Sequence, residues 1–169
     1  MKISVITVSD SCSKDRSLDK SGPILIELLN ESTVLKEVEL LDYLIVPDET
    51  DQIESALWKC IKNDSNVILT TGGTGFAKRD VTPEATKKVI KKECPGIVTA
   101  ILVKGLEKTP MAALSRLAAG IVENSLIINL PGSPKAVREG FEVIEGLLPH
   151  SVALLQDNTK EVSDVHKNT

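Results

Sequence analysis

Residues 67–83 constrain the fold most, because they combine a strand, a glycine-rich turn and a helix start. The apolar run Val67-Ile68-Leu69 is typical of a buried strand. Thr82-Pro83 is typical of a helix start, since threonine caps well and proline fits the first turn. Glycines such as those in Gly72-Gly73-Thr74-Gly75 permit positive φ and close backbone approach to a ligand. Successive N–H groups in such a turn can form a concavity for phosphate oxygens.

Two familiar glycine motifs do not match this segment. A P-loop requires Lys and Ser or Thr after its last glycine, whereas Phe76 and Ala77 follow Gly75. A dinucleotide fingerprint that begins at Gly73 requires glycine at the position of Lys78. On its own the segment fits a tight structural turn as well as a phosphate site, so the surrounding sequence has to decide.

Strand and helix patterns alternate along the chain. Apolar residues at helical spacing predict a helix over 53–61, and a nearly continuous apolar run predicts a buried strand over 3–8. This alternation favours an α/β fold with a largely parallel sheet. The expected strands are 3–8, 34–46, 67–69 and 126–130; the expected helices are 20–30, 53–61, 83–92, 110–120, 134–148 and 150–156, with 97–105 undecided.

Length and composition fit one globular domain. The 169 residues are 41% hydrophobic, which is enough for a substantial core. We expect residues 1–156 to form this domain and residues 157–169 to form a polar tail, either frayed or continuing into further sequence. The net charge of -4 argues against a general nucleic-acid-binding surface, and no apolar run approaches the roughly 20 residues that membrane insertion requires.

The cysteines and histidines argue against a zinc site. Cys12, Cys60 and Cys94 are odd in number and far apart, which fits a reducing compartment. The amino terminus enters an expected strand at once and lacks the long apolar region of a signal peptide, so we expect a cytoplasmic protein. His150 and His166 are isolated, so ordinary histidines are favoured over metal ligands.

Four predicted loops follow strands and therefore meet at one edge of the sheet. In open α/β sheets, ligands bind outside the carboxyl ends of the strands. The loops are residues 9–11, 47–49, the glycine loop (residues 70–81) and 131–134, where Ser133 can cap the next helix. Each loop alone could be ordinary turn chemistry, but their common location favours a binding site.

Asp48 and Asp80 are the candidate metal ligands in these loops. Two carboxylates at neighbouring strand ends can hold Mg²⁺, with substrate phosphates completing its coordination. Cations such as Arg79 and Arg116 could neutralise further phosphate charge. The alternatives are structural: Asp48 could cap a helix after Pro47, and Asp80 could form a salt bridge with Arg79.

Six segments in this order resemble the molybdopterin adenylyltransferase family, which includes gephyrin-type G domains. They are Thr-Val-Ser-Asp-Ser at 7–11, Val-Pro-Asp-Glu at 46–49, Leu-Thr-Thr-Gly-Gly-Thr-Gly-Phe-Ala at 69–77, Arg-Asp-Val-Thr-Pro-Glu-Ala-Thr at 79–86, Leu-Ser-Arg at 114–116 and Ile-Asn-Leu-Pro-Gly-Ser at 128–133. The resemblance covers nearly the whole chain, as far as Leu-Pro-His at 148–150.

The resemblance implies a three-layer α/β/α sandwich that assembles as a homotrimer. It also implies a reaction in which Mg²⁺-ATP adenylylates the phosphate of molybdopterin and releases pyrophosphate, a late step of molybdenum cofactor biosynthesis. The family's catalytic acidic positions correspond to Asp48 and Asp80, which would also hold Mg²⁺. A molybdenum-insertion domain or protein is an expected partner.

The resemblance also supplies candidate binding residues for molybdopterin and ATP, without separating the two. They are Ser9, Asp10, Thr71, Gly72, Gly73, Thr74, Gly75, Ser115, Arg116, Pro131, Gly132 and Ser133. Lys78 stands where gephyrin-like sequences often have proline, a difference that would change the stiffness of the loop.

Two other functions remain open at this point. The chain could be a trimeric, gephyrin-type scaffold that binds molybdopterin or protein partners without turnover, or a relative that acts on another anionic ligand. Because Asp48, Asp80 and the loop glycines are all present, the sequence favours the enzyme.

Overall fold

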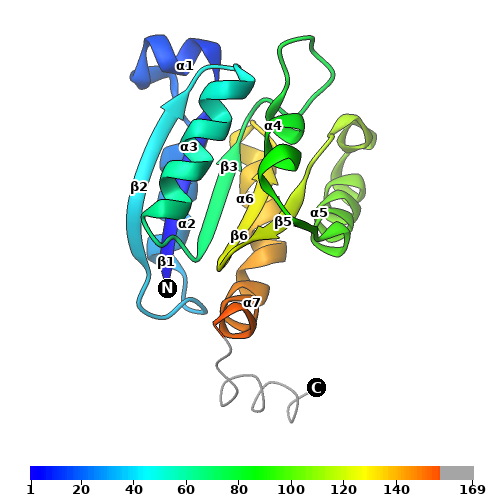
Figure 1. The fold of residues 1–169 in the computed structure, drawn as a ribbon. Helices are drawn as coiled ribbons and strands as arrows, with labels where there is room; N and C mark the ends of the chain where they lie inside the picture. Colours follow the sequence, from blue (N-terminus) through cyan, green and yellow to red (C-terminus); the bar gives the residue numbers. More distant parts are fainter. Residues whose placement is uncertain (157–169) are drawn as a thin grey trace.

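A computed structural model describes residues 1–156, which form a six-stranded sheet with helices on both faces (Figure 1). The strands are β1 (Lys2–Val8), β2 (Glu39–Val46), β3 (Val67–Thr71), β4 (Lys92–Glu93), β5 (Ala119–Val122) and β6 (Ser125–Leu130). Their order in the sheet is β2-β1-β3-β6-β5-β4. The first four strands in this order run parallel, β5 pairs antiparallel with β6, and β4 pairs antiparallel with β5. The predicted three-layer sandwich with a mostly parallel sheet is confirmed. The predicted tail, residues 157–169, lies outside the described residues.

The helices form the two outer layers (Figure 1). They are α1 (Asp10–Lys14), α2 (Ser21–Glu31), α3 (Thr50–Lys62), α4 (Thr82–Val89), α5 (Pro95–Lys108), α6 (Pro134–Ile144) and α7 (Leu148–Leu155), with 3-10 turns η1 (Arg16–Leu18), η2 (Pro110–Leu114) and η3 (Glu145–Leu147). Helices α3 and α4 bury one face of the sheet, while α2, α5, α6 and α7 bury the other. None of the helices in the described part of the chain is long and apolar enough to cross a bilayer.

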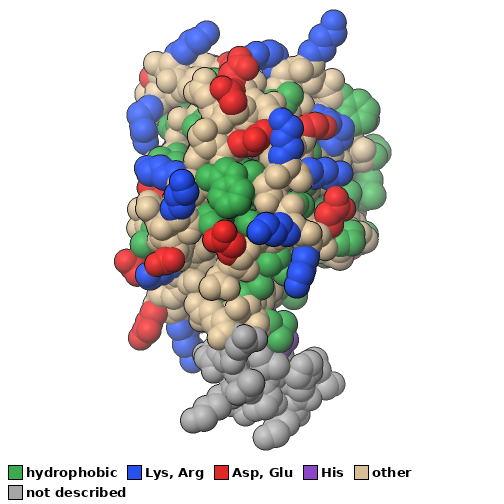
Figure 2. Space-filling view, in the orientation of Figure 1, with side chains coloured by type: hydrophobic (Ala, Val, Ile, Leu, Met, Phe, Trp, Pro, Cys, Tyr) green, Lys and Arg blue, Asp and Glu red, His purple; other side chains and the backbone are tan. Residues whose placement is uncertain are grey.

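The central strands are apolar on both faces because both faces are buried. In β3, Val67 and Leu69 pack toward α2 and α6, and Ile68 packs toward α3 and α4. This arrangement explains why the sequence shows continuous apolar runs and no alternation with polar residues. The outer surface of α3 and α4, by contrast, carries interspersed acidic and basic side chains (Figure 2). Lys88 of α4 and Glu54 of α3 form an ion pair there at 2.9 Å.

One buried polar residue fixes the middle of the fold. The Asn129 side chain donates to the hydroxyls of Thr70 and Thr86, each at 2.9 Å, and its oxygen accepts from the Ala118 N–H at 3.1 Å. It therefore joins β6 to β3, to α4 and to the segment before β5. Since α4 begins directly after the glycine loop, this network also anchors that loop.

The boundaries of several predicted helices and strands were wrong. The helix expected over 110–120 is a short turn, η2, followed by strand β5, because residues 119–122 pair with β6. The helix expected over 83–92 ends at Val89, so Lys91 and Lys92 do not extend its outer face. Residues 34–38 do not form part of β2, and the undecided segment 97–105 is helical within α5.

We expect Asn129→Ala to lower the free energy of unfolding by about 3 kcal/mol, because it leaves two buried hydroxyls and one buried N–H without partners. Urea unfolding followed by circular dichroism measures this change. The control is Asn124→Ala in the exposed turn between β5 and β6, which should change stability little. Equal losses for the two variants would contradict the anchoring role of Asn129.

Candidate active site

The four loops meet at the carboxyl edge of the sheet, as predicted. They enclose a cavity of about 390 Å³, which we call the polar cavity. Its lining includes Ser9 after β1, Asp48 after β2, Gly73 after β3 and Gly132 after β6. Asp80, from the far end of the glycine loop, also faces this cavity.

The glycine loop needs its first two glycines because of conformation and space. Gly72 and Gly73 have φ of 97° and 62°, values that favour glycine. A Cβ atom on Gly72 would overlap the Val8 carbonyl, and one on Gly73 would lie 2.7 Å from Asp48 Oδ1. The loop therefore brings bare backbone next to the Asp48 carboxylate, as a phosphate cradle requires.

Two threonine hydroxyl groups bind the start of the glycine loop to neighbouring segments. Thr82 Oγ1 donates to the Gly72 carbonyl at 2.8 Å, and Thr71 Oγ1 donates to the Pro131 carbonyl at 2.8 Å. The Thr71 hydroxyl thus connects the glycine loop to the loop after β6. Ser133 caps α6, as predicted, by accepting from the Ala136 N–H at 3.2 Å.

Arg116 braces the second half of the glycine loop. Its Nε donates to the Gly75 carbonyl at 2.8 Å, its Nη2 donates to the Asp80 carbonyl at 2.6 Å, and its Nη1 pairs with Glu84. The Asp80 carboxylate in turn accepts from the Ala77 N–H at 3.0 Å. The Arg116 guanidinium is therefore committed to the loop backbone and Glu84, and it positions Asp80.

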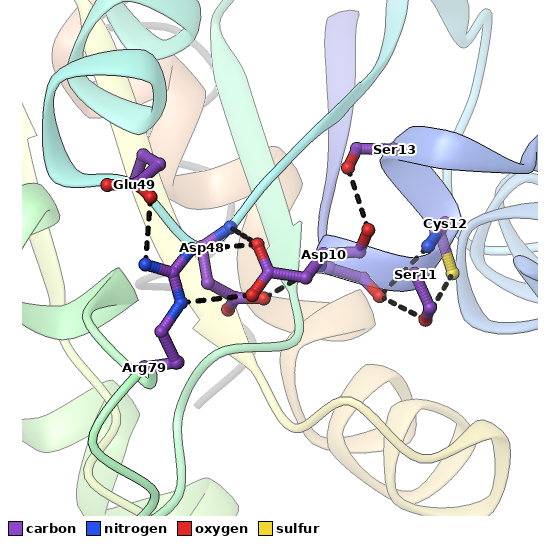
Figure 3. A network of polar contacts seen from close by, with 8 residues as sticks. Asp10, Ser11, Cys12, Ser13, Asp48, Glu49 and Arg79 are labelled. Atoms are coloured by element: carbon purple, nitrogen blue, oxygen red, sulfur yellow. Dashed lines mark hydrogen bonds and ion pairs between the residues drawn. The ribbon is translucent and has the colours of Figure 1, made fainter.

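Asp10 and Asp48 hold each other through reciprocal hydrogen bonds. The Asp10 N–H donates to Asp48 Oδ2 at 2.9 Å, and the Asp48 N–H donates to Asp10 Oδ1 at 3.2 Å (Figure 3). Arg79 binds Asp10 through two nitrogens, at 2.9 and 3.0 Å, and binds Glu49 at 2.8 Å. Both structural alternatives were wrong: Glu49, not Asp48, is at the amino end of α3, and Arg79 pairs with Asp10 and Glu49 rather than Asp80.

Crowding of carboxylates sets the electrostatics of the site. Burial raises the pKa of Asp48, and the neighbouring Asp10 and Asp80 charges raise it further, although the Asp10 N–H and Arg79 oppose the change. The hydrogen bonds from Arg79 lower the pKa of Asp10. Within residues 1–156 no cluster of three or more Asp, Glu, His or Cys side chains forms a complete metal site. The polar cavity is lined by the two carboxylates of Asp48 and Asp80, and Mg²⁺ commonly takes one or two carboxylates while water and substrate phosphates complete its shell.

A second cavity, of about 460 Å³, adjoins the first, and we call it the apolar cavity. Its walls come largely from apolar side chains of α5, η2 and the segment after η2, among them Ile101, Met111 and Leu117. The two cavities share Gly73, Asp80 and Gly132. Asp80 therefore lies where two ligands would meet.

The structure places most predicted site residues in these cavities and two outside them. The polar cavity contains Ser9, Asp48, Thr71, Gly72, Gly73, Asp80 and Gly132; the apolar cavity contains Gly73, Thr74, Gly75, Asp80, Ser115, Pro131, Gly132 and Ser133. Asp10 and Arg116 line neither cavity and hold the loops in place.

Sequence reasoning missed Lys20 and Ser21, which line the polar cavity at the amino end of α2, and the α5–η2 wall of the apolar cavity. The sequence carries no local signal for this wall, because the exposure of η2 side chains such as Met111, which is 63% exposed, is a property of the folded chain. A larger hollow of about 740 Å³ lies at the opposite end of the sheet, but none of the predicted site residues lies there.

Comparison with known proteins agrees with this geometry. The family model described as "Probable molybdopterin binding domain" matches residues 4–150. The chain belongs to this family. Family members similar to it include the molybdopterin adenylyltransferase of Helicobacter pylori strain J99, which is 44% identical over 96% of this chain and 92% of its own length. The molybdopterin adenylyltransferase of Pyrococcus furiosus is 38% identical, and the match covers 88% of each chain.

Other family members are much longer or have known structures. The molybdenum cofactor synthesis protein cinnamon of Drosophila melanogaster is 48% identical over 96% of this chain, which spans only 27% of cinnamon. Among solved structures, the molybdopterin biosynthesis enzyme MoaB of Thermus thermophilus has a TM-score of 0.82 and 40% identity, and the match covers 91% of this chain and 95% of MoaB. The fold is thus that of molybdenum cofactor biosynthesis proteins.

We expect Asp48→Asn to raise Tm at pH 7 by a few degrees. Because the pKa of Asp48 is raised above 3.8 in the folded state, its ionised form destabilises the fold above that raised pKa, and the penalty disappears below pH 3.8. The gain in Tm should therefore shrink as the pH falls toward 4. Differential scanning calorimetry between pH 4 and 8 measures this dependence.

Asp42→Asn is the matched control with the opposite sign. Burial tends to raise the pKa of Asp42, but the hydrogen bond from Asn63 and the ion pair with Lys59 outweigh it, so that pKa is lowered. Its stabilisation is present above pH 3.8 and is lost as the pH falls through the folded pKa, so Asp42→Asn should lower Tm at pH 7. A lower Tm for both variants would refute the proposed crowding at Asp48.

Proposed function

We propose that this chain is a molybdopterin adenylyltransferase, which transfers AMP from ATP to the phosphate of molybdopterin and releases pyrophosphate. The observation that carries the proposal is the meeting of the polar and apolar cavities at Asp80, Gly73 and Gly132. A transfer between two bound substrates needs two adjoining sites with the reacting groups at their junction. The names of several family members, molybdopterin adenylyltransferase, support the same reaction.

In the proposed reaction, an oxygen of the molybdopterin phosphate attacks the α-phosphorus of ATP. A P–O bond forms to the α-phosphorus, the bond to the bridging oxygen breaks, and pyrophosphate leaves with its electron pair. Asp48 and Asp80 would hold Mg²⁺, which when bound neutralises phosphate charge. The backbone N–H groups of the glycine loop would stabilise the charge that develops on the transferred phosphoryl group.

Further features of the assembly belong to this proposal. We expect a homotrimer, a cytoplasmic location and a molybdenum-insertion domain or protein that takes the adenylylated product. Exposed apolar side chains such as Phe76 and Val103, 67% and 52% exposed, are compatible with contacts between subunits. Light scattering coupled to size-exclusion chromatography tests the trimer.

We expect Asp80→Asn to lower kcat for adenylylation by about 100- to 1,000-fold, because the junction of the two cavities loses its charge while an amide oxygen can still accept from the Ala77 N–H. Pyrophosphate release with molybdopterin and Mg²⁺-ATP measures the rate. Asp64→Asn, which removes an exposed aspartate near the opposite end of the sheet, is the control and should retain wild-type turnover. Full turnover by Asp80→Asn would contradict the catalytic role of Asp80.

Removal of divalent cations should abolish turnover by the wild-type protein. With EDTA in excess we expect no pyrophosphate release, and added Mg²⁺ should restore it, because the anionic Asp48 and Asp80 repel the phosphates of ATP unless a divalent cation offsets both charges. Undiminished turnover in EDTA would contradict a metal held by these aspartates.

The scaffold alternative makes a different prediction for binding. An enzyme must bind molybdopterin, so isothermal titration of molybdopterin into the protein should show saturable binding. Absence of binding at every accessible concentration would favour a protein-binding scaffold of the gephyrin type.

A further inference from the structure

We propose that Arg79 is a positioning residue that fixes Asp10, and through Asp10 fixes Asp48, in the geometry required for adenylyl transfer. This inference rests on the proposed function but concerns a residue that lines neither cavity. Arg79 lies in the glycine loop, whereas its partners lie in the loops after β1 and β2. One side chain thus joins three of the four loops that form the site (Figure 3).

The contact between Arg79 and Asp10 has a defined geometry. Nε donates to Asp10 Oδ2 at 3.0 Å and Nη2 donates to Asp10 Oδ1 at 2.9 Å, so the guanidinium grips both carboxylate oxygens. The remaining nitrogen, Nη1, binds Glu49 at 2.8 Å. Paired, charge-assisted bonds of this kind fix orientation as well as distance.

The contact continues from Asp10 to Asp48. The Asp10 carboxylate accepts from the Asp48 N–H, and the Asp48 carboxylate accepts from the Asp10 N–H, at 3.2 and 2.9 Å. Arg79 orients the Asp10 side chain, Asp10 holds the Asp48 backbone, and the Asp10 backbone holds the Asp48 side chain. Displacement of Asp10 would therefore displace the carboxylate of Asp48.

The segment that carries Asp10 needs such support. Helix α1 has five residues, and a helix this short is not stable on its own. Cys12 is its only buried residue. Asp10 and Asp48 also repel each other, and the positive charge of Arg79 offsets this repulsion.

Solvent exposure indicates that the role of Arg79 is geometric. The side chains of Arg79, Asp10 and Glu49 are 53%, 41% and 46% exposed. Ion pairs as exposed as these contribute little to global stability. Loss of Arg79 should therefore impair turnover much more than it impairs folding, which separates a positioning residue from a merely structural one.

The first test compares three variants in steady-state adenylylation assays. We expect Arg79→Ala to lower kcat by about 10- to 100-fold, with smaller changes in KM for ATP and molybdopterin, since Asp48 is misplaced and both cavities remain. Arg79→Lys should recover part of the loss because it keeps the charge without the two-pronged grip. Arg138→Ala, which removes an exposed arginine paired with Glu27 on the far side of α6, should stay within about twofold of wild type.

The second test asks whether Arg79 acts through Asp10. A double-mutant cycle compares Arg79→Ala, Asp10→Ala and the double variant. We expect the double variant to be no slower than Asp10→Ala, because Arg79 has no route to Asp48 once the Asp10 carboxylate is gone. Multiplicative losses in kcat, or a loss confined to KM for ATP, would instead assign Arg79 a direct contact with phosphate and overturn the proposal.

The third test needs no substrate and is therefore independent of the proposed reaction. Hydrogen exchange measured by mass spectrometry on peptides that cover Asp10 and Asp48 should be faster in Arg79→Ala than in wild type, since both N–H groups lose their fixed acceptors. Peptides from α3 should be unchanged. Faster exchange in a protein without adenylyl transfer would refute the proposed function alone, whereas unchanged exchange would refute the role of Arg79.

Discussion

Repulsion among carboxylates is the constraint on which the site depends. Asp10, Asp48 and Asp80 converge because parallel strands β1, β2 and β3 end at the same edge. Such a cluster is held together only where cations and N–H donors oppose the repulsion. Arg79 opposes the repulsion from outside the cavities by binding the Asp10 carboxylate, and Arg116 holds the backbone around Asp80 in place. Negative charge is thus concentrated at this edge of the sheet, and a bound divalent cation would offset it.

The glycines of the glycine loop approach the crowded carboxylates with their backbone alone, because glycine carries no side chain. At Gly73 a side chain would collide with Asp48, and at Gly72 it would collide with β1. The other end of the loop enters α4, which Asn129 anchors to the sheet from within the core. The loop therefore connects the buried core to the charged edge, and hydrogen bonds at both of its ends hold it in one conformation, as a preorganised phosphate site requires.

The sequence predicted the sheet and most of the site because its strongest signals are local. Continuous apolar runs marked β1, β3 and β6, and the strand-end loops placed Ser9, Asp48 and Gly132 together. It could not predict the roles of Asp10 and Arg79, which depend on contacts across 69 positions of the chain. The first two residues of strand β5 were assigned to the end of a helix because its pairing with β6, not its composition, determines its conformation. The apolar cavity was missed because its wall forms only when α5 folds back onto η2.

The residues that hold Asp48 in place and the residues that form the apolar cavity lie in different parts of the chain, and this separation has an evolutionary consequence. Arg79 and its partners Asp10 and Glu49 come from the loops after β1, β2 and β3, whereas much of the apolar cavity comes from α5 and η2, which follow later in the chain. Substitutions at positions such as Met111 or Leu102 can therefore remodel what the cavity accepts without disturbing Asp48 or Asp80. A fold arranged in this way can acquire new substrates while it keeps one phosphoryl-transfer chemistry.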